Sequence, residues 1–62
     1  MQKYICKNTC LFPGGSIAFT EGNTYISLDS IGVMAQFIDD QGNVHIVDKK
    51  YLTSNFDLDK NW

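Results

Sequence analysis

The segment Asp40-Gln41-Gly42 limits the fold of this chain most strongly, because it separates two β-prone runs by a length typical of a tight hairpin. Residues 31–39 before it and residues 43–48 after it are rich in β-branched and aromatic side chains, as strands are. A type I turn at Asp40-Gln41, followed by Gly42 in the left-handed region, makes a three-residue loop with a bulge and fixes the strand register. The predicted cross-strand pairs are Ile38 with Val44, Phe37 with His45, Gln36 with Ile46 and Ala35 with Val47.

The first half of the chain contains further short extended segments. Residues 3–6 are β-prone and lead into a predicted loop over residues 7–16, where Pro13-Gly14-Gly15 is a turn signal. Residues 16–28 then predict two extended pieces on either side of Glu21-Gly22-Asn23, where glycine supplies the positive φ that a tight reversal needs.

The C-terminal part predicts little regular structure beyond one helical turn. Residues 48–54 favour that turn and Phe56 a last short strand, while residues 57–62 fit either a loose tail or an acidic, aromatic segment that docks on a partner. With 62 residues the chain can form one domain, residues 1–62, with a thin core. The sequence therefore predicts an all-β fold, a small five-stranded, partly open barrel with one helical turn before the last strand.

From Tyr4 to Phe56 the order of these signals resembles the Src-homology-3 type of barrel. Ile17-Ala18-Phe19-Thr20-Glu21-Gly22-Asn23 is similar to that family's diverging turn, and residues 42–52 are similar to its distal hairpin, fourth strand and helical turn, which ends in the pair Tyr51-Leu52. The resemblance implies the barrel fold.

The departures from the family argue against its peptide-binding activity. Members that bind proline-rich peptides use a Trp before the third strand and a Pro that opens the helical turn, and together these line a groove for a polyproline helix. Here Gly32 or Val33 stands where the Trp would be, Asp48 replaces the Pro, and only Tyr51 keeps its place.

The sequence also resembles small barrel proteins of this type encoded by bacteriophages and prophages. The similarity rests on a Phe-x-x-Gly-x-x-Tyr segment, formed by Phe19, Gly22 and Tyr25, and on the acidic hairpin that contains Gly42-Asn43. It implies a protein that binds a host or phage component, in some cases to inhibit a defence system.

Charge and hydropathy exclude several classes of partner. The formal net charge is −2, there is no arginine, and the only adjacent basic pair is Lys49-Lys50, so we do not expect a nucleic-acid partner. No run approaches the roughly 20 apolar residues of a membrane helix, and residues 1–6 lack the apolar core of a secretion signal. We therefore expect a cytoplasmic protein, within the bacterial host if it is phage-encoded, with no membrane contact.

No residue pattern indicates a cofactor, a metal site or a catalytic centre. Cys6 and Cys10 are compatible with two reduced thiols, with a disulfide, or with a metal shared between chains, because a tetrahedral site needs four ligands and only His45 could add a third. Asp39-Asp40-Gln41-Gly42-Asn43 lacks the alternating acids and closing Glu of a calcium loop. His45 instead fits a partly buried imidazole on the face of Ala35 and Val47.

Strand alternation leads to a candidate partner-binding surface. If Ala35 and Val47 face the core, then Val33 and Phe37 also point inward. The opposite face then carries Met34, Ile38, Val44 and Ile46, a larger apolar group than a monomer usually exposes. The loop over residues 7–16 or the tail with Trp62 could cover it; alternatively, it is an interface with a second copy or a target protein, to which Trp62 would contribute.

The leading hypothesis is a non-enzymatic protein–protein interaction module of phage or prophage origin, which acts on a host component such as a defence system. Its partner is a protein, a second copy of the chain as a homo-oligomer, or both. The alternative is a small nucleic-acid-associated barrel, in which Tyr4, Tyr25, Tyr51 and Trp62 would stack on bases.

Overall fold

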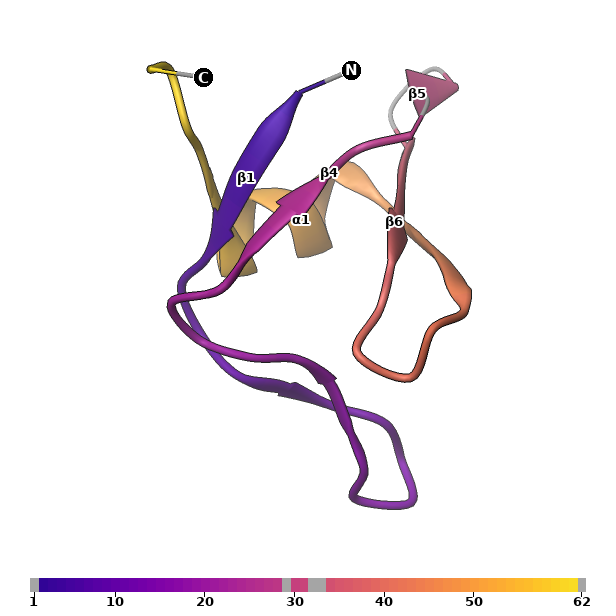
Figure 1. The fold of residues 1–62 in the computed structure, drawn as a ribbon. Helices are drawn as coiled ribbons and strands as arrows, with labels where there is room; N and C mark the ends of the chain where they lie inside the picture. Colours follow the sequence, from indigo (N-terminus) through magenta and orange to yellow (C-terminus); the bar gives the residue numbers. More distant parts are fainter. Residues whose placement is uncertain (1, 29, 32–33, 62) are drawn as a thin grey trace.

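The computed structural model describes residues 2–28, 30–31 and 34–61, and this part of the chain is mostly β with one short helix (Figure 1). The strands are β1 (Lys3–Cys6), β2 (Cys10–Leu11), β3 (Ile17–Phe19), β4 (Thr24–Ile26), β5 (Ser30–Ile31), β6 (Met34–Ile38), β7 (Val44–Val47) and β8 (Phe56–Leu58). The helix α1 (Lys49–Asn55) precedes the last strand. The predicted all-β class and the helical segment before the last strand are confirmed.

The strands form three antiparallel sheets, and we call each of these groups of paired strands a ladder. β1 lies between β4 and β8, β6 lies between β5 and β7, and β2 pairs with β3. The backbone N–H of Leu28, just after β4, donates to Gln36 of β6 at 2.8 Å and so joins the first ladder to the hairpin. Figure 1 shows β1 and the C-terminal segment on one side of the molecule and the β6 hairpin on the other. Among the described residues these ladders do not close on one another into a ring.

The β6–β7 hairpin has the predicted register at all four cross-strand pairs. Gly42 has a φ of +84°, as the bulged loop requires. Asp39 holds the turn from within, because its Oδ1 accepts hydrogen bonds from the backbone N–H groups of Gln41 at 2.9 Å and Asn43 at 3.1 Å. The turn chemistry therefore fixes which side chains of the two strands face the same way.

Asp40 ties this hairpin to the turn between β3 and β4. Its two carboxylate oxygens accept hydrogen bonds from the hydroxyls of Tyr25, at 2.7 Å, and Thr20, at 2.6 Å. The Tyr25 hydroxyl in turn accepts from the backbone N–H of Thr20 at 2.9 Å, and the N–H of Asp40 donates to Ala18. The network fixes the position of the hairpin relative to the first half of the chain.

Aromatic rings fill the core between the ladders. Phe19 and Phe37 are fully buried, and Phe56 is 4% exposed. Phe37 stacks on Phe56 with ring centroids 5.0 Å apart, while Phe19 meets Phe37, Phe56 and Tyr25 edge to face. Edge-to-face and offset contacts of this kind add to the burial energy of each ring.

The described residues contain eight strand segments rather than the five predicted. The predicted loop over residues 7–16 contains β2, because the turn at Pro13-Gly14-Gly15 brings its flanks together, and the N–H of Phe12 donates to Ser16 at 2.8 Å. The predicted tail begins later than residue 57, since β8 runs on to Leu58 along β1.

The helix lies one residue further along the chain than the predicted segment, residues 48–54. It covers Lys49–Asn55, and Asp48 is its N-cap, whose Oδ1 accepts from the backbone N–H of Tyr51 at 2.8 Å. An aspartate in this position satisfies a backbone donor that the first turn leaves free, which stabilises the helix start. In the described part of the chain, no helix has the length and apolar character needed to cross a membrane.

Gly42→Val is expected to destabilise the fold by about 1–2 kcal/mol, because a β-branched residue is strained at positive φ. Apart from the adjacent residues in the chain, no described atom lies within 4 Å of the position that a Cβ would take, so the effect comes from the backbone. Gly14→Val is the matched control, since Gly14 has equally open surroundings and no positive φ. Thermal or urea unfolding measures both variants; equal stabilities would mean that the turn conformation is not as described.

Candidate functional site

The strongest candidate for a functional site is the outward face of the β6–β7 hairpin. Alternation along the two strands divides their side chains into a buried set, Ala35, Phe37 and Val47, and an outward set. We call the outward set the outer hairpin face; it consists of Met34, Gln36, Ile38, Val44 and Ile46. Met34, Ile38, Val44 and Ile46 point away from the core, as strand alternation predicted, and are between 44% and 58% exposed.

Pairing across the hairpin brings these side chains together. Ile38 lies opposite Val44, and Gln36 lies opposite Ile46. The N–H of Asp39 donates to Asn43 at 2.9 Å, which makes both of these facing pairs the non-hydrogen-bonded kind. Side chains approach most closely in such pairs, so Ile38 and Val44 form a continuous apolar contact on the surface.

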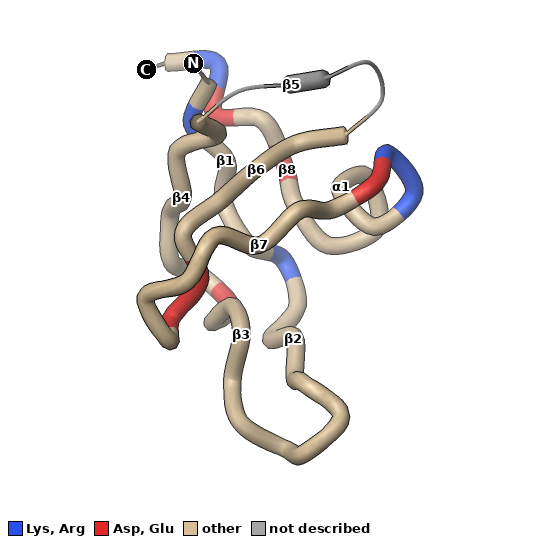
Figure 2. Tube along the Cα trace, turned by 90° about the vertical axis from the view of Figure 1, so that its right-hand side faces the viewer, with Lys and Arg blue, Asp and Glu red and all other residues tan. Residues whose placement is uncertain are grey.

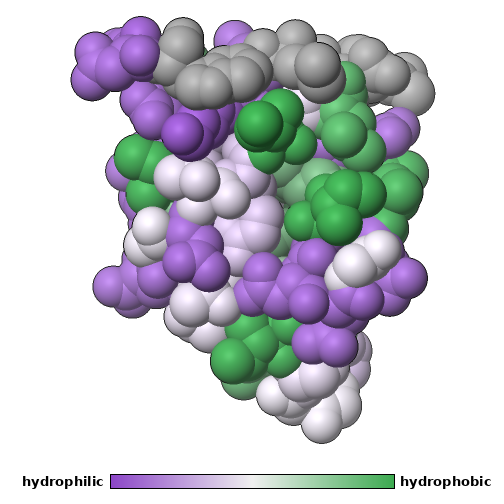
Figure 3. Space-filling model, in the orientation of Figure 1, coloured by the Kyte–Doolittle hydropathy of each residue, from purple (hydrophilic) through white to green (hydrophobic). Residues whose placement is uncertain are grey.

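The N-terminal loop does not cover this face. Phe12 packs instead on the inner side of β7, where its ring is stacked on His45 with centroids 5.5 Å apart. Figure 3 shows apolar surface gathered on the right-hand side of the view, where β6 and β7 lie. The C-terminal segment runs along β1, where the N–H of Asp59 donates to Lys3. The predicted contribution of Trp62 lies outside the described residues, as does the predicted inward position of Val33.

His45 occupies the inner face, as predicted, with a side chain that is 24% exposed. Its Nδ1 lies 3.4 Å from Oδ2 of Asp39 but makes no hydrogen bond, and the ring packs against Phe19 as well as Phe12. No nucleophile is hydrogen-bonded to this imidazole among the residues with described side chains. The imidazole is thus packed between two aromatic rings beside a turn carboxylate.

Cys6 and Cys10 are free thiols and both are buried. Their Sγ atoms donate to the same acceptor, the backbone carbonyl of Asn8, at 3.0 and 3.2 Å. Within the described residues, no group of three or more His, Cys, Asp or Glu side chains gathers to hold a metal ion. The two thiols are not bridged to each other in this structure.

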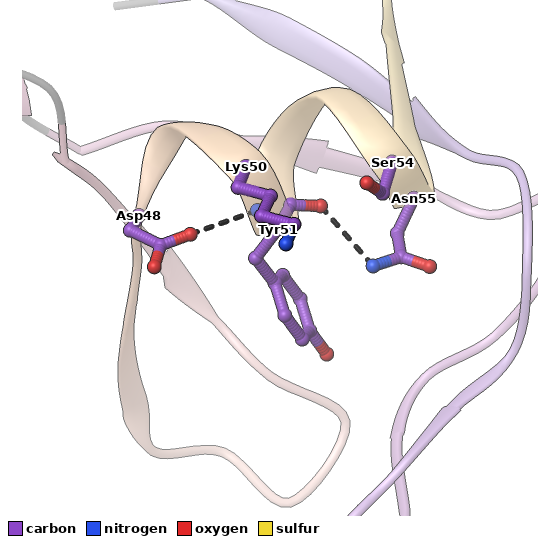
Figure 4. A pocket seen from close by; sticks show the side chains of 5 residues that line it. All are labelled: Asp48, Lys50, Tyr51, Ser54 and Asn55. Atoms are coloured by element: carbon purple, nitrogen blue, oxygen red, sulfur yellow. Dashed lines mark hydrogen bonds between the residues drawn. The ribbon is translucent and has the colours of Figure 1, made fainter.

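An open pocket of about 310 Å³ lies beside α1 (Figure 4) and was not predicted. Its lining residues are Asp48, Lys50, Tyr51, Ser54 and Asn55. Asp48 accepts the Tyr51 N–H, and the side-chain amide of Asn55 donates to the Tyr51 carbonyl at 3.1 Å, so both polar side chains already serve the helix. The ammonium group of Lys50 and the hydroxyl of Ser54 also line the pocket, and the capping residue Asp48 was the sequence signal for this feature.

Alkaline pH is expected to lower the stability of the fold. Burial raises the pKa of the Cys6 thiol and of the Tyr51 phenol, and burial together with the Asp40 carboxylate raises the pKa of Tyr25. The folded chain therefore holds these protons more tightly than the unfolded chain, whose thiols ionise near pH 8.5 and phenols near pH 10. The resulting stability is present below those values and is lost as the pH rises through the higher folded pKa values.

Thermal unfolding from pH 7 to pH 11 measures this loss. Cys6→Ala should flatten the dependence between pH 8 and pH 10, because it removes the group that titrates first. A melting temperature that stays constant up to pH 11 would contradict the assignment.

Comparison of the chain with protein-family models, with curated proteins and with solved structures finds no match.

Proposed function

We propose that this protein is a non-enzymatic interaction module that binds another polypeptide through the outer hairpin face. The observation that carries the proposal is that Met34, Ile38, Val44 and Ile46 lie exposed on one face of one hairpin. Exposed apolar groups of this size are typical of protein interfaces, whereas single exposed apolar residues are common on any surface.

The fold we propose around this site is a small, partly open barrel of the Src-homology-3 type. Support comes from the hairpin register, the helix before the last strand, and Tyr51 in its expected place on that helix. The family's peptide groove is not part of the proposal, because Asp48 acts as a helix N-cap where peptide-binding members have a Pro. The interaction surface lies on the hairpin instead.

The biological setting we propose is a phage or prophage protein that acts on a host component in the bacterial cytoplasm, for example by inhibiting a defence system. Its resemblance to phage-encoded barrels supports this setting. The net charge of −2 and the lack of arginine favour a protein over a nucleic acid as the partner.

Capture from bacterial lysate with the immobilised chain tests the site. Ile46→Glu places a charge on the outer hairpin face and should reduce capture of a specific partner about tenfold or more, as expected when a central apolar contact is lost. Ile5→Glu is the matched control, because Ile5 is also exposed but lies on β1, in a different ladder. Equal capture by all three chains would show that the outer hairpin face is not the binding site.

A further inference from the structure

β7 is an edge strand. It ends the ladder β5-β6-β7, and β6 is its only partner among the described strands. Because Ile38–Val44 and Gln36–Ile46 are non-hydrogen-bonded pairs, the N–H and C=O groups of Val44 and Ile46 point away from β6. None of the described residues forms a hydrogen bond to these groups. This edge can therefore pair with a further strand.

The charges on either side of β7 differ in sign. Asp39 and Asp40 lie in the turn before the strand, whereas Lys49 and Lys50 follow its other end, where only Asp48 is acidic (Figure 2). The strand itself, Val44–Val47, carries no carboxylate or ammonium group. An antiparallel partner with the same sequence would place its basic end beside the acidic turn, and its acidic turn beside the basic end. A parallel partner would bring like charges together.

We propose that two copies of this chain pair through β7, antiparallel and about a two-fold axis, with Val44 of each copy opposite Ile46 of the other. The inference goes beyond the proposed function, since the second copy pairs with the edge of β7, beside the outer hairpin face, and leaves that face exposed. In this register the outward N–H and C=O groups of Val44 and Ile46 form backbone hydrogen bonds with the same groups of the second copy. A two-fold arrangement is closed, so it produces a dimer rather than a fibre.

The same register extends the outer hairpin face across the dimer. Val44 lies opposite Ile38 within one copy and opposite Ile46 of the second copy. The apolar row therefore continues across the dimer from one sheet into the next. The two His45 residues face each other on the inner side, next to the axis. Two edge strands of this length make a small interface, below about 1,200 Å², so the association is reversible and depends on concentration.

Sedimentation velocity over a range of concentrations, with Val44→Pro and Val44→Ala, tests the backbone pairing. Proline lacks the N–H that points outward at this edge, but the ladder to β6 does not use that N–H, so the monomer should stay folded. We expect a concentration-dependent dimer for the wild-type chain, loss of the dimer in Val44→Pro, and a dimer in Val44→Ala. A wild-type chain that stays monomeric at its highest attainable concentration overturns the inference, as does a Val44→Pro chain that dimerises like the wild type.

Charge complementation tests the register and does not depend on proline being tolerated. One chain carries Val44→Glu and Ile46→Glu, and another carries Val44→Lys and Ile46→Lys. Each should be monomeric alone, and a mixture of the two should form a one-to-one dimer, because each Glu then faces a Lys. A mixture that stays monomeric overturns the register. If the wild-type chain is monomeric while lysate capture still depends on Ile46, the dimer is excluded and the proposed function stands. If the wild-type chain dimerises but capture does not depend on Ile46, the dimer stands and the proposed function is wrong.

Discussion

Phe37→Ala is expected to leave most of the chain unfolded at room temperature. Phe37 is fully buried and its ring contacts Phe56, Tyr4 and Phe19 with centroid separations of 5.0, 5.6 and 5.9 Å. Truncation of a buried Phe to Ala typically costs about 3–5 kcal/mol. A chain of 62 residues has a total stability of roughly 3–9 kcal/mol, so this loss removes much or all of it.

Ile38→Ala is the matched control for this variant. Ile38 is the next residue in β6, but its side chain is 44% exposed on the outer hairpin face. We expect a change of about 1 kcal/mol or less, in keeping with other surface substitutions. Urea unfolding followed by near-ultraviolet circular dichroism compares the two variants. A Phe37→Ala chain as stable as Ile38→Ala would contradict the description of the core.

The hairpin could be predicted from the sequence because the signals that form it are local. Asp40-Gln41-Gly42 sets the turn, the turn sets the register, and strand alternation then assigns each side chain to a face. That Val44 and Ile46 lie on one face follows from those steps alone, whereas the direction of that face also rested on the expectation that Ala35 and Val47 face the core. The candidate site was predictable for the same reason.

The remaining ladders depend on contacts between residues far apart in the sequence. Cys6 pairs with Phe56 and Tyr4 with Leu58. No local sequence pattern indicates that the C-terminal residues pair with the edge of β1. The end of β8 was therefore missed. The inward packing of Phe12 on His45 is also a tertiary contact, so the sequence could not decide whether the loop covers the outer hairpin face.

Asp40 illustrates the same limit within a correctly predicted element. The sequence identified it as a turn residue, and it does lie in the turn. Its bonds to Tyr25 and Thr20 depend on how the hairpin meets the segment between β3 and β4. Turn propensity carries no information on that contact.

The second large loss of stability is expected for Val47→Glu, because the side chain of residue 47 lies on the core face of the hairpin. Val47 is 3% exposed and pairs with buried Ala35, whereas the neighbouring Ile46 is 57% exposed. A carboxylate at residue 47 would be buried without a cation, which costs several kcal/mol and should unfold the chain. The same carboxylate at residue 46 remains in water, so the only expected loss is strand propensity, about 1 kcal/mol at most.

Thermal unfolding of Ile46→Glu and Val47→Glu side by side is the most direct test that the outer hairpin face is free to bind a partner. We expect a cooperative transition close to that of the wild-type chain for Ile46→Glu, and no cooperative unfolding transition for Val47→Glu. An unfolded Ile46→Glu chain, or a Val47→Glu chain that folds normally, would mean that the two faces of the hairpin are assigned the wrong way round.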